Sequence, residues 1–192
     1  MGDLTEIRWH GRGGQGSKTA SILLGKVASE VGKNIQAFPE YGPERMGAPV
    51  LAYNRISDDE LTVHCQIEEP QIVVVLDPTL IGTVDLTAGL PRDGTVIVNT
   101  EQSPDKIRQL LGLSEGSVYT VDANRISEEE IGRTFPNTPM LGALVKITEV
   151  VDPEQFVDYI RREFKKKFAD KEEVIDGNIR SIERAYQEVQ GG

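Results

Sequence analysis

The residues best suited to chemistry in this chain form a glycine-rich segment close to its start. Residues 11–16 read Gly-Arg-Gly-Gly-Gln-Gly and fit the pattern G-x-G-x-x-G between an expected strand at 4–10 and an expected helix at 17–31. Glycine permits a tight turn and a close approach to a ligand, and a helix N-terminus offers N–H groups and partial positive charge to a phosphate. The segment therefore predicts a site for a phosphate-bearing ligand. The alternative is a tight strand-to-helix turn that binds nothing.

The expected site extends from the glycines into the first residues of the helix, where a lysine adds positive charge to that of the arginine. Its residues are Gly11, Arg12, Gly13, Gly14, Gln15, Gly16, Ser17 and Lys18.

Two nucleotide-binding motifs resemble this segment without matching it. A P-loop needs its lysine directly after the last glycine, but here Ser17 comes first, so Lys18 points to a different side of the helix. A nicotinamide site needs an acid at the end of the second strand, where Glu40 lies between Pro39 and a Tyr-Gly-Pro turn. No cluster of catalytic acid, base and nucleophile accompanies either motif. A stand-alone nicotinamide- or nucleotide-binding Rossmann-type protein is kept as the alternative function.

A loop rich in proline and glycine follows the second expected strand, over residues 39–49. It carries Glu40, Tyr41, Glu44 and Arg45. One interpretation is that a glutamate pairs with Arg45 and holds a rigid surface loop. The other is that these side chains form a contact surface, because loops placed on a rigid sheet often carry binding residues.

The rest of the chain alternates strand and helix patterns. Segments 50–56 and 61–67 are separated by four residues, which predicts an antiparallel hairpin. The unbroken apolar run 72–76 is typical of a central parallel strand covered on both faces. Further strands are expected at 34–38, 95–98 and 118–121, and a helix at 103–111 with Ser103 as its cap.

The last third of the chain is expected to be helical. Helices begin at Thr138-Pro139 and at Asp152-Pro153, and another ends near Val189. The pattern predicts an α/β, Rossmann-like three-layer fold with a mainly parallel sheet and one hairpin. We expect a single domain over residues 1–192, with 152–190 as a C-terminal helix pair that packs on the body or reaches a partner.

Composition limits the classes of partner. The 192 residues carry a net charge of −10, which disfavours nucleic-acid binding, and the basic run around 161–167 is interpreted as a solvated helix face. No apolar run is long enough for a membrane helix and no secretory signal is evident, so we expect a cytoplasmic protein. The single cysteine, Cys65, cannot hold an iron–sulfur cluster, and we expect an inert, partly buried thiol beside a structural His64.

Four segments resemble one protein family. Residues 7–16, the block 36–49 (Gln-Ala-Phe-Pro-Glu-Tyr-Gly-Pro-Glu-Arg-Met-Gly-Ala-Pro), Asp77-Pro78 and 137–144 are similar to the gamma subunits of 2-oxoacid:ferredoxin oxidoreductases. The Phe-Pro-Glu-Tyr-Gly-Pro-Glu-Arg form looks most like the pyruvate enzymes. The family usually has an apolar residue where this chain has Ser17. This difference does not affect the expected helix start, but it leaves open which groups contact a ligand.

The resemblance implies a role inside a complex that converts pyruvate and coenzyme A to acetyl-CoA and carbon dioxide and passes electrons to ferredoxin. In that family the alpha and beta subunits hold thiamine diphosphate, and the beta and delta subunits hold [4Fe-4S] clusters. The gamma part is associated with coenzyme A, a substrate whose phosphates suit the 11–16 segment. Glu40, Tyr41, Glu44 and Arg45 are the expected additional contacts, either to coenzyme A or to the thiamine-binding subunits. A scaffold that binds no ligand is the remaining possibility.

Overall fold

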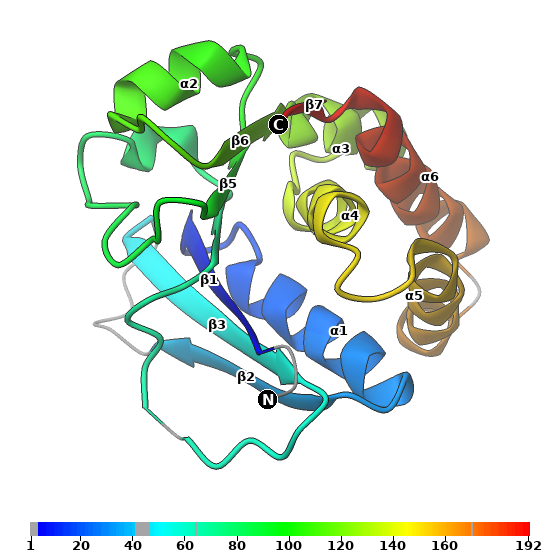
Figure 1. Ribbon diagram of the computed structural model, residues 1–192. Helices are drawn as coiled ribbons and strands as arrows, with labels where there is room; N and C mark the ends of the chain where they lie inside the picture. Colours follow the sequence, from blue (N-terminus) through cyan, green and yellow to red (C-terminus); the bar gives the residue numbers. More distant parts are fainter. Residues whose placement is uncertain (1–3, 41–46, 64, 170) are drawn as a thin grey trace.

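A seven-stranded sheet with helices on both faces forms the body of the chain (Figure 1). The computed structural model describes residues 4–40, 47–63, 65–169 and 171–192. The strand order is β2-β3-β1-β4-β5-β6-β7. The strands are β1 (Thr5–Arg12), β2 (Asn34–Glu40), β3 (Pro49–Ser57), β4 (Ile72–Val75), β5 (Thr95–Asn99), β6 (Ser117–Val121) and β7 (Gln190–Gly191). The helices are α1 (Ser17–Glu30), the 3-10 turn η1 (Pro78–Leu80), α2 (Pro104–Leu111), α3 (Ala123–Ile131), α4 (Asn137–Thr148), α5 (Pro153–Phe168) and α6 (Glu172–Glu188).

Most strands of the sheet run in one direction. β1, β4, β5 and β6 pair in parallel with their neighbours, whereas β3 is antiparallel to both β1 and β2, and β7 is antiparallel to β6. β2 therefore points the same way as β1, with β3 inserted between them. The expected three-layer α/β fold with a mainly parallel sheet is confirmed.

The hairpin is not where the sequence predicted it. The described part of 61–67 is coil, and β3 instead forms its antiparallel pairs with β2 and β1. Both edges of β3 are therefore occupied. The coil is instead bound to β3 through Arg55. Arg55 Nη1 donates to the carbonyl of Cys65 at 2.7 Å, and Nη2 donates to that of Gln66 at 3.2 Å. Cys65 is exposed, so the expectation of a partly buried thiol was wrong.

Two apolar layers cover the sheet. On one face, Ile7 and Trp9 of β1 pack with α1 and with the helices α3 to α6, and the Trp9 indole N–H donates to Asn54 Oδ1 at 2.8 Å. On the other face, Val73 and Val75 of β4 pack against α2 and the segment after η1. Alternate residues of one strand thus enter different layers, which is the period-2 consequence of the pleat.

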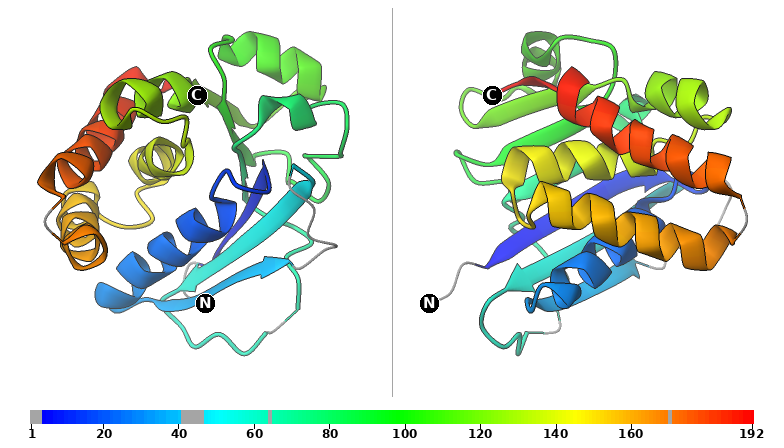
Figure 2. Two further views of the ribbon diagram at one scale, coloured as in Figure 1. Left: turned by 180° about the vertical axis from the view of Figure 1, so that it is seen from behind. Right: turned by 90° about the vertical axis from the view of Figure 1, so that its right-hand side faces the viewer.

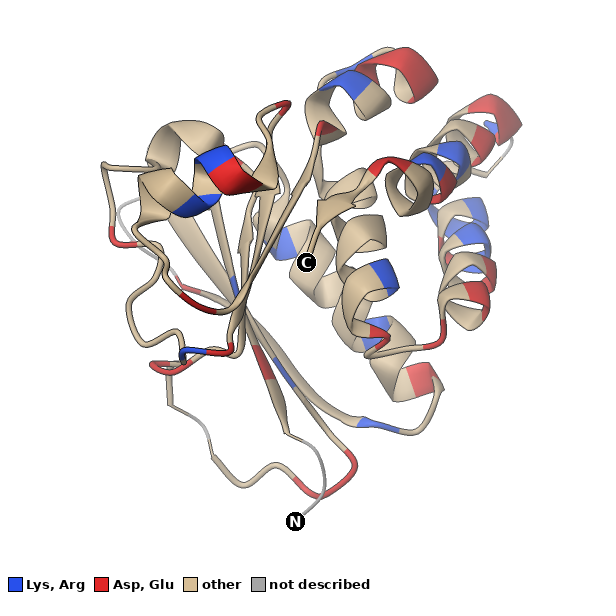
Figure 3. Cartoon of the chain, turned by 45° about the horizontal axis from the view of Figure 1, so that its top comes forward, with Lys and Arg blue, Asp and Glu red and all other residues tan. Residues whose placement is uncertain are grey.

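The C-terminal helices are part of this core. α4 lies against the sheet, and α6 lies outside it beside α3 and α5 (Figure 2). α4 and α6 approach closely at Gly142, where an added Cβ would lie 3.1 Å from the Cα of Ile182. The helices predicted from 138, 152 and the final segment are confirmed, whereas α3 and β7 had not been predicted. Both acidic and basic residues occur along the outer helices (Figure 3).

Candidate functional site

The glycine loop, defined as residues 11–16, joins the end of β1 to α1 at the edge of the sheet where the parallel strands end. Gly14 and Gly16 have φ values of 97° and 87°, a region that side chains make costly. Gly16 is the N-cap of α1, and no side chain of the described residues caps this helix. The loop is tied to the start of β3, because Gly13 N–H donates to the carbonyl of Ala48 at 3.1 Å.

A glutamine side chain fixes the shape of the loop. Gln15 Oε1 accepts from the Arg12 backbone N–H at 2.7 Å, and Gln15 Nε2 donates to Asp77 Oδ2 at 2.7 Å. Asp77 follows β4 and begins η1, where its other oxygen accepts from the N–H and hydroxyl of Thr79. The ends of the neighbouring strands β1 and β4 are therefore joined through side chains.

Arg12 of the loop forms an ion pair with the same carboxylate, that of Asp77. Arg12 Nε lies 3.2 Å from Asp77 Oδ2, Nη2 donates to the Thr79 hydroxyl at 3.0 Å, and Nη1 donates to the Gly47 carbonyl at 3.0 Å. Burial by itself would raise the pKa of Asp77, but the hydrogen bonds from Thr79 and Gln15 and the charge of Arg12 outweigh it and lower that pKa. Arg12 thus shapes the loop, and Lys18 is exposed on the first turn of α1.

The predicted residues fall into three groups. The glycine loop, Ser17 and Lys18 lie together. Glu40 ends β2 and accepts from the Tyr53 hydroxyl at 2.8 Å, on a strand separated from β1 by β3. The predicted contacts Tyr41, Glu44 and Arg45 lie outside the described residues.

Sequence reasoning missed the role of Asn137. This first residue of α4 packs against Gly16 so closely that a Cβ on Gly16 would lie 2.9 Å from the Asn137 Cγ. Asn137 Oδ1 is buried and has no hydrogen-bond partner among the described residues, and the same holds for the hydroxyl of Ser17. Such groups are uncommon in protein interiors. The sequence feature that could have indicated this contact is the polar pair Asn137-Thr138, directly before Pro139 at the start of an apolar helix.

Arg8 and His10 form a buried pair on the face of β1 opposite to Ile7 and Trp9. Arg8 donates from Nε to His10 Nε2 at 3.0 Å and from Nη2 to the carbonyls of Leu86 and Ala88. Burial, reinforced by the charge of Arg8, lowers the pKa of His10 to about 3. His10 is therefore neutral at physiological pH and accepts the hydrogen bond from Arg8. The pair joins β1 to residues 86–88 through the Arg8 hydrogen bonds, and the charge of Asp85 acts on both side chains.

The arrangement suits binding and positioning of an anion. The described residues contain no group of three or more His, Cys, Asp or Glu side chains that could hold a metal ion. No helix within the described ranges is long and apolar enough to cross a membrane. A glycine loop at the carboxyl edge of a parallel sheet, opening a helix, is the arrangement of a Rossmann-like domain.

Comparison with known proteins gives the family. The profile of the family described as pyruvate ferredoxin/flavodoxin oxidoreductase matches residues 6–188. The pyruvate synthase subunit PorC of Thermotoga maritima is 48% identical over 184 residues, which span 96% of this chain and 94% of that protein. The common subunit gamma of the pyruvate/ketoisovalerate oxidoreductases of Thermococcus kodakarensis is 44% identical, over 95% and 96% of the two chains. The crystal structure of the Thermotoga maritima pyruvate oxidoreductase subunit PORC matches with a TM-score of 0.86 at 44% identity, covering 98% of each chain. The chain belongs to the pyruvate ferredoxin/flavodoxin oxidoreductase family, in which it matches the gamma subunits along nearly their whole length.

Proposed function

We propose that this chain, as the gamma subunit of a pyruvate:ferredoxin oxidoreductase, helps to bind or position coenzyme A while the bond-making steps occur in partner subunits. The complex oxidatively decarboxylates pyruvate with coenzyme A to acetyl-CoA and carbon dioxide and delivers electrons to ferredoxin. The alpha, beta and delta subunits are the proposed partners; they hold thiamine diphosphate and the [4Fe-4S] clusters. One cysteine in the whole chain agrees with clusters held elsewhere, since a cluster requires several thiolates.

The observation that carries the coenzyme A proposal is the N-terminus of α1. It opens at the carboxyl edge of the parallel strands, is capped by Gly16 without a capping side chain from the described residues, and has Lys18 exposed on its first turn. Helix N-termini of this kind stabilise phosphate, and coenzyme A carries a pyrophosphate and a 3′-phosphate. Arg12 contributes by holding the loop through Asp77, and Glu40 and the 41–46 segment remain proposed contacts.

The geometry favours this function over a stand-alone nicotinamide protein. In a dinucleotide-binding fold the acid that binds the ribose ends the strand beside β1. Here β3 lies beside β1, and Glu40 on β2 is two strand spacings away, roughly 9–10 Å. Its carboxylate also accepts from Tyr53.

The test uses the reconstituted complex with this chain as its gamma subunit. Lys18→Gln should raise the KM for coenzyme A roughly threefold to tenfold, because a charge-assisted phosphate contact is lost. The KM for pyruvate should stay unchanged, and Lys18→Arg should restore most of the loss. The matched control is Lys106→Gln, which removes an exposed charge on α2. An unchanged KM for coenzyme A in Lys18→Gln would argue against the assigned contact, and pyruvate turnover by the isolated chain would argue against a non-catalytic subunit.

A further inference from the structure

The side chain of Asn137 fills the space beside the Cα of Gly16, the residue that caps α1. A Cβ placed on Gly16 would lie 2.9 Å from the Asn137 Cγ and 3.0 Å from both its Cβ and its Nδ2. Among the described residues, these three atoms are the nearest to that position apart from the chain neighbours of Gly16. Asn137 therefore limits where the first turn of α1 can lie.

The start of α4 is itself fixed in the fold, so Asn137 has a rigid backbone. Asn137 and Thr138 are each only 3% exposed. The Thr138 hydroxyl donates to Asn178 Oδ1 at 3.1 Å, and Asn178 Nδ2 donates to the Val174 carbonyl at 2.7 Å, which ties α4 to α6. The contact at Gly16 thus connects the glycine loop to the helical layer of the core.

The glycine loop is held by different elements at its different residues. Gln15 is bonded to Asp77 beyond β4, and the Gly13 N–H is bonded to the carbonyl that precedes β3. These contacts fix the loop from the sheet. Asn137 of α4 supplies a contact at Gly16, where the loop becomes the helix. It therefore acts on the first turn of α1, whose N–H groups have no partner within the helix.

Asn137 acts through Gly16 and does not itself reach a ligand. Its Oδ1 is buried without a hydrogen-bond partner among the described residues, so it is closed to a molecule from solvent. An unmet acceptor of this kind lowers stability, whereas an apolar side chain of similar shape would not carry that cost. The contact with Gly16 is one of shape, and substitution can separate shape from polarity.

We propose that Asn137 is a positioning residue for coenzyme A. By packing against Gly16, it holds the left-handed N-cap and the first N–H groups of α1 in the arrangement that receives a phosphate. This inference rests on the proposed function of the glycine loop. Groups that are fixed before binding lower the entropic cost of binding, so loss of the contact weakens coenzyme A binding and leaves the chemistry proposed for the partner subunits unchanged.

Kinetics of the reconstituted complex test the effect on coenzyme A. Asn137→Ala removes the contacts of Cγ and Nδ2, and it should raise the KM for coenzyme A roughly threefold to tenfold. The kcat and the KM for pyruvate should stay unchanged, because only binding is altered. Asn137→Leu keeps a branched side chain of similar shape and should return the KM to within about twofold of the wild-type value.

The matched control is Val145→Ala on the same helix. Val145 is fully buried and lies about two turns beyond Asn137, so its truncation leaves a cavity in the core away from the loop. This variant should lower stability and leave the KM for coenzyme A unchanged.

Hydrogen exchange of the purified full chain tests the positioning without any ligand. The probes are backbone N–H groups whose hydrogen bonds depend on the loop, those of Arg12, Gly13, Gln15 and Ala20. Their exchange should accelerate roughly threefold or more in Asn137→Ala. Asn137→Leu should exchange like the wild type, and Val145→Ala corrects for general destabilisation.

The two measurements separate the inference from the proposed function. Unchanged exchange in Asn137→Ala would overturn the positioning role whatever the KM. An unchanged KM in Asn137→Ala beside a raised KM in Lys18→Gln would overturn the inference alone, whereas an unchanged KM in both variants would overturn the proposed function with it. A fall in kcat without a change in KM, an equal rise in KM in Val145→Ala, or no recovery in Asn137→Leu would also count against the inference.

Discussion

Gln15 and Asp77 are 62 residues apart in the sequence, yet the amide of Gln15 donates to the Asp77 carboxylate at 2.7 Å. Since Gln15 also accepts from the Arg12 backbone, one side chain connects the glycine loop to the end of β4. The glycines permit the conformation of the loop, and the Gln15–Asp77 contact selects one conformation among those permitted. Preorganisation of this kind lowers the entropic cost of placing N–H groups around a ligand.

Replacing this carboxylate should loosen the loop. Asp77→Asn removes the acceptor for Gln15 and the charge beside Arg12, so we expect a loss of about 1.5–3 kcal/mol in the free energy of unfolding, measured by urea denaturation. Asp85→Asn is the matched control, because Asp85 accepts from Thr87 in the same Asp-x-Thr turn but makes no ion pair within 4 Å among the described residues. Equal losses in the two variants would contradict the role of Asp77 in the loop.

The pH dependence offers a second check on Asp77. Its pKa is lower in the folded chain than in the unfolded chain, so its contribution is present above the unfolded value, near 4. The contribution is lost as the pH falls through the folded pKa. Asp77→Asn should therefore destabilise the chain at pH 7, and its stability should approach that of the wild type only as the pH falls below the unfolded value and through the lowered folded pKa. A difference that stays constant with pH would show that charge is not involved.

The two left-handed glycines of the loop should differ in their tolerance of a side chain. Gly14→Ala meets no atom within 4 Å and should cost only the conformational penalty of positive φ, about 1 kcal/mol. Gly16→Ala should cost more, roughly 2–3 kcal/mol, because its Cβ also collides with Asn137. The added Asn137→Ala change should recover part of this loss. Thermal or urea unfolding of the four chains measures the difference, and equal effects at the two glycines would contradict the packing argument.

Local features were predictable from the sequence. The strand, glycine loop and helix at residues 5–30 follow from spacing within one short segment, and Ser103 caps α2 as expected by accepting from the Lys106 N–H. The amphipathic faces of α5 and α6 also identified buried residues, such as Phe156 and Ile179. These features depend on neighbours along the chain.

Pairings between distant segments were not predictable in the same way. An alternating pattern at 61–67 resembled a strand, but strand pairing depends on which edges are available, and β3 has β1 on one side and β2 on the other. The contacts of Asp77 and Asn137 with the loop require the order of the strands and the path of α4. The sequence alone contains such residues but does not show which of them are in contact in the fold.

Stability should depend on His10 between pH 7 and pH 4. Burial and the charge of Arg8 lower the folded pKa to about 3, whereas the unfolded value is near 6.5. Below pH 6.5 the unfolded chain therefore binds a proton that the folded chain does not, so stability falls as pH decreases, by up to about 1.4 kcal/mol per pH unit. His10→Gln keeps an acceptor for Arg8 and should flatten this slope in urea denaturation at pH 7, 6 and 5. Parallel curves for the two proteins would contradict a neutral buried His10.

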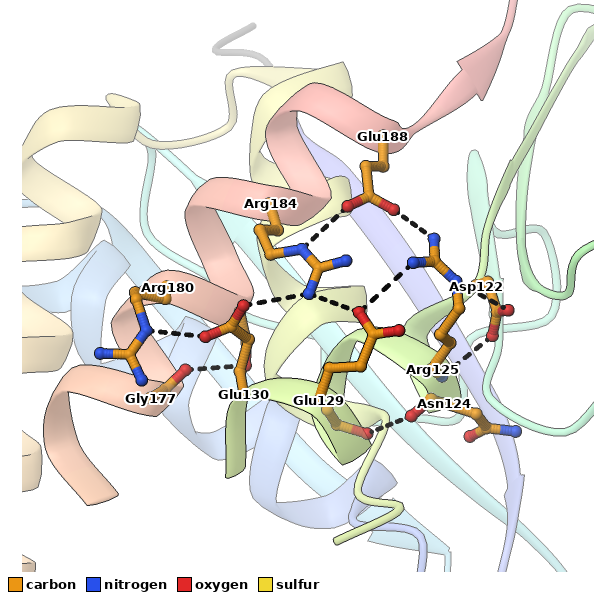
Figure 4. A network of polar contacts seen from close by, with 11 residues as sticks. Asp122, Asn124, Arg125, Glu129, Glu130, Gly177, Arg180, Arg184 and Glu188 are labelled. Atoms are coloured by element: carbon orange, nitrogen blue, oxygen red, sulfur yellow. Dashed lines mark hydrogen bonds and ion pairs between the residues drawn. The ribbon is translucent and has the colours of Figure 1, made fainter. Parts of the chain in front are cut away.

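A network of charges joins α3 to α6 (Figure 4). Arg184 is its centre, because it lies 2.7 Å from Glu129, 3.0 Å from Glu130 and 2.9 Å from Glu188. Removing this one cation leaves three carboxylates near one another, each of which still contacts Arg180 or Arg125. The network differs from an isolated surface pair, since several carboxylates share one ordered guanidinium.

Arg184→Met should therefore lower the free energy of unfolding by about 1–2 kcal/mol at low salt, a figure reduced for the partial exposure of the network. The loss should shrink in 1 M salt, because screening weakens both the lost attraction and the new repulsion. Arg92→Met removes an arginine whose partner Glu115 lies 3.6 Å away at an exposed position, and it should change stability by less than about 0.5 kcal/mol. Urea denaturation at two salt concentrations separates the cases. Similar small effects for both variants would mean that the network does not hold α6 against α3.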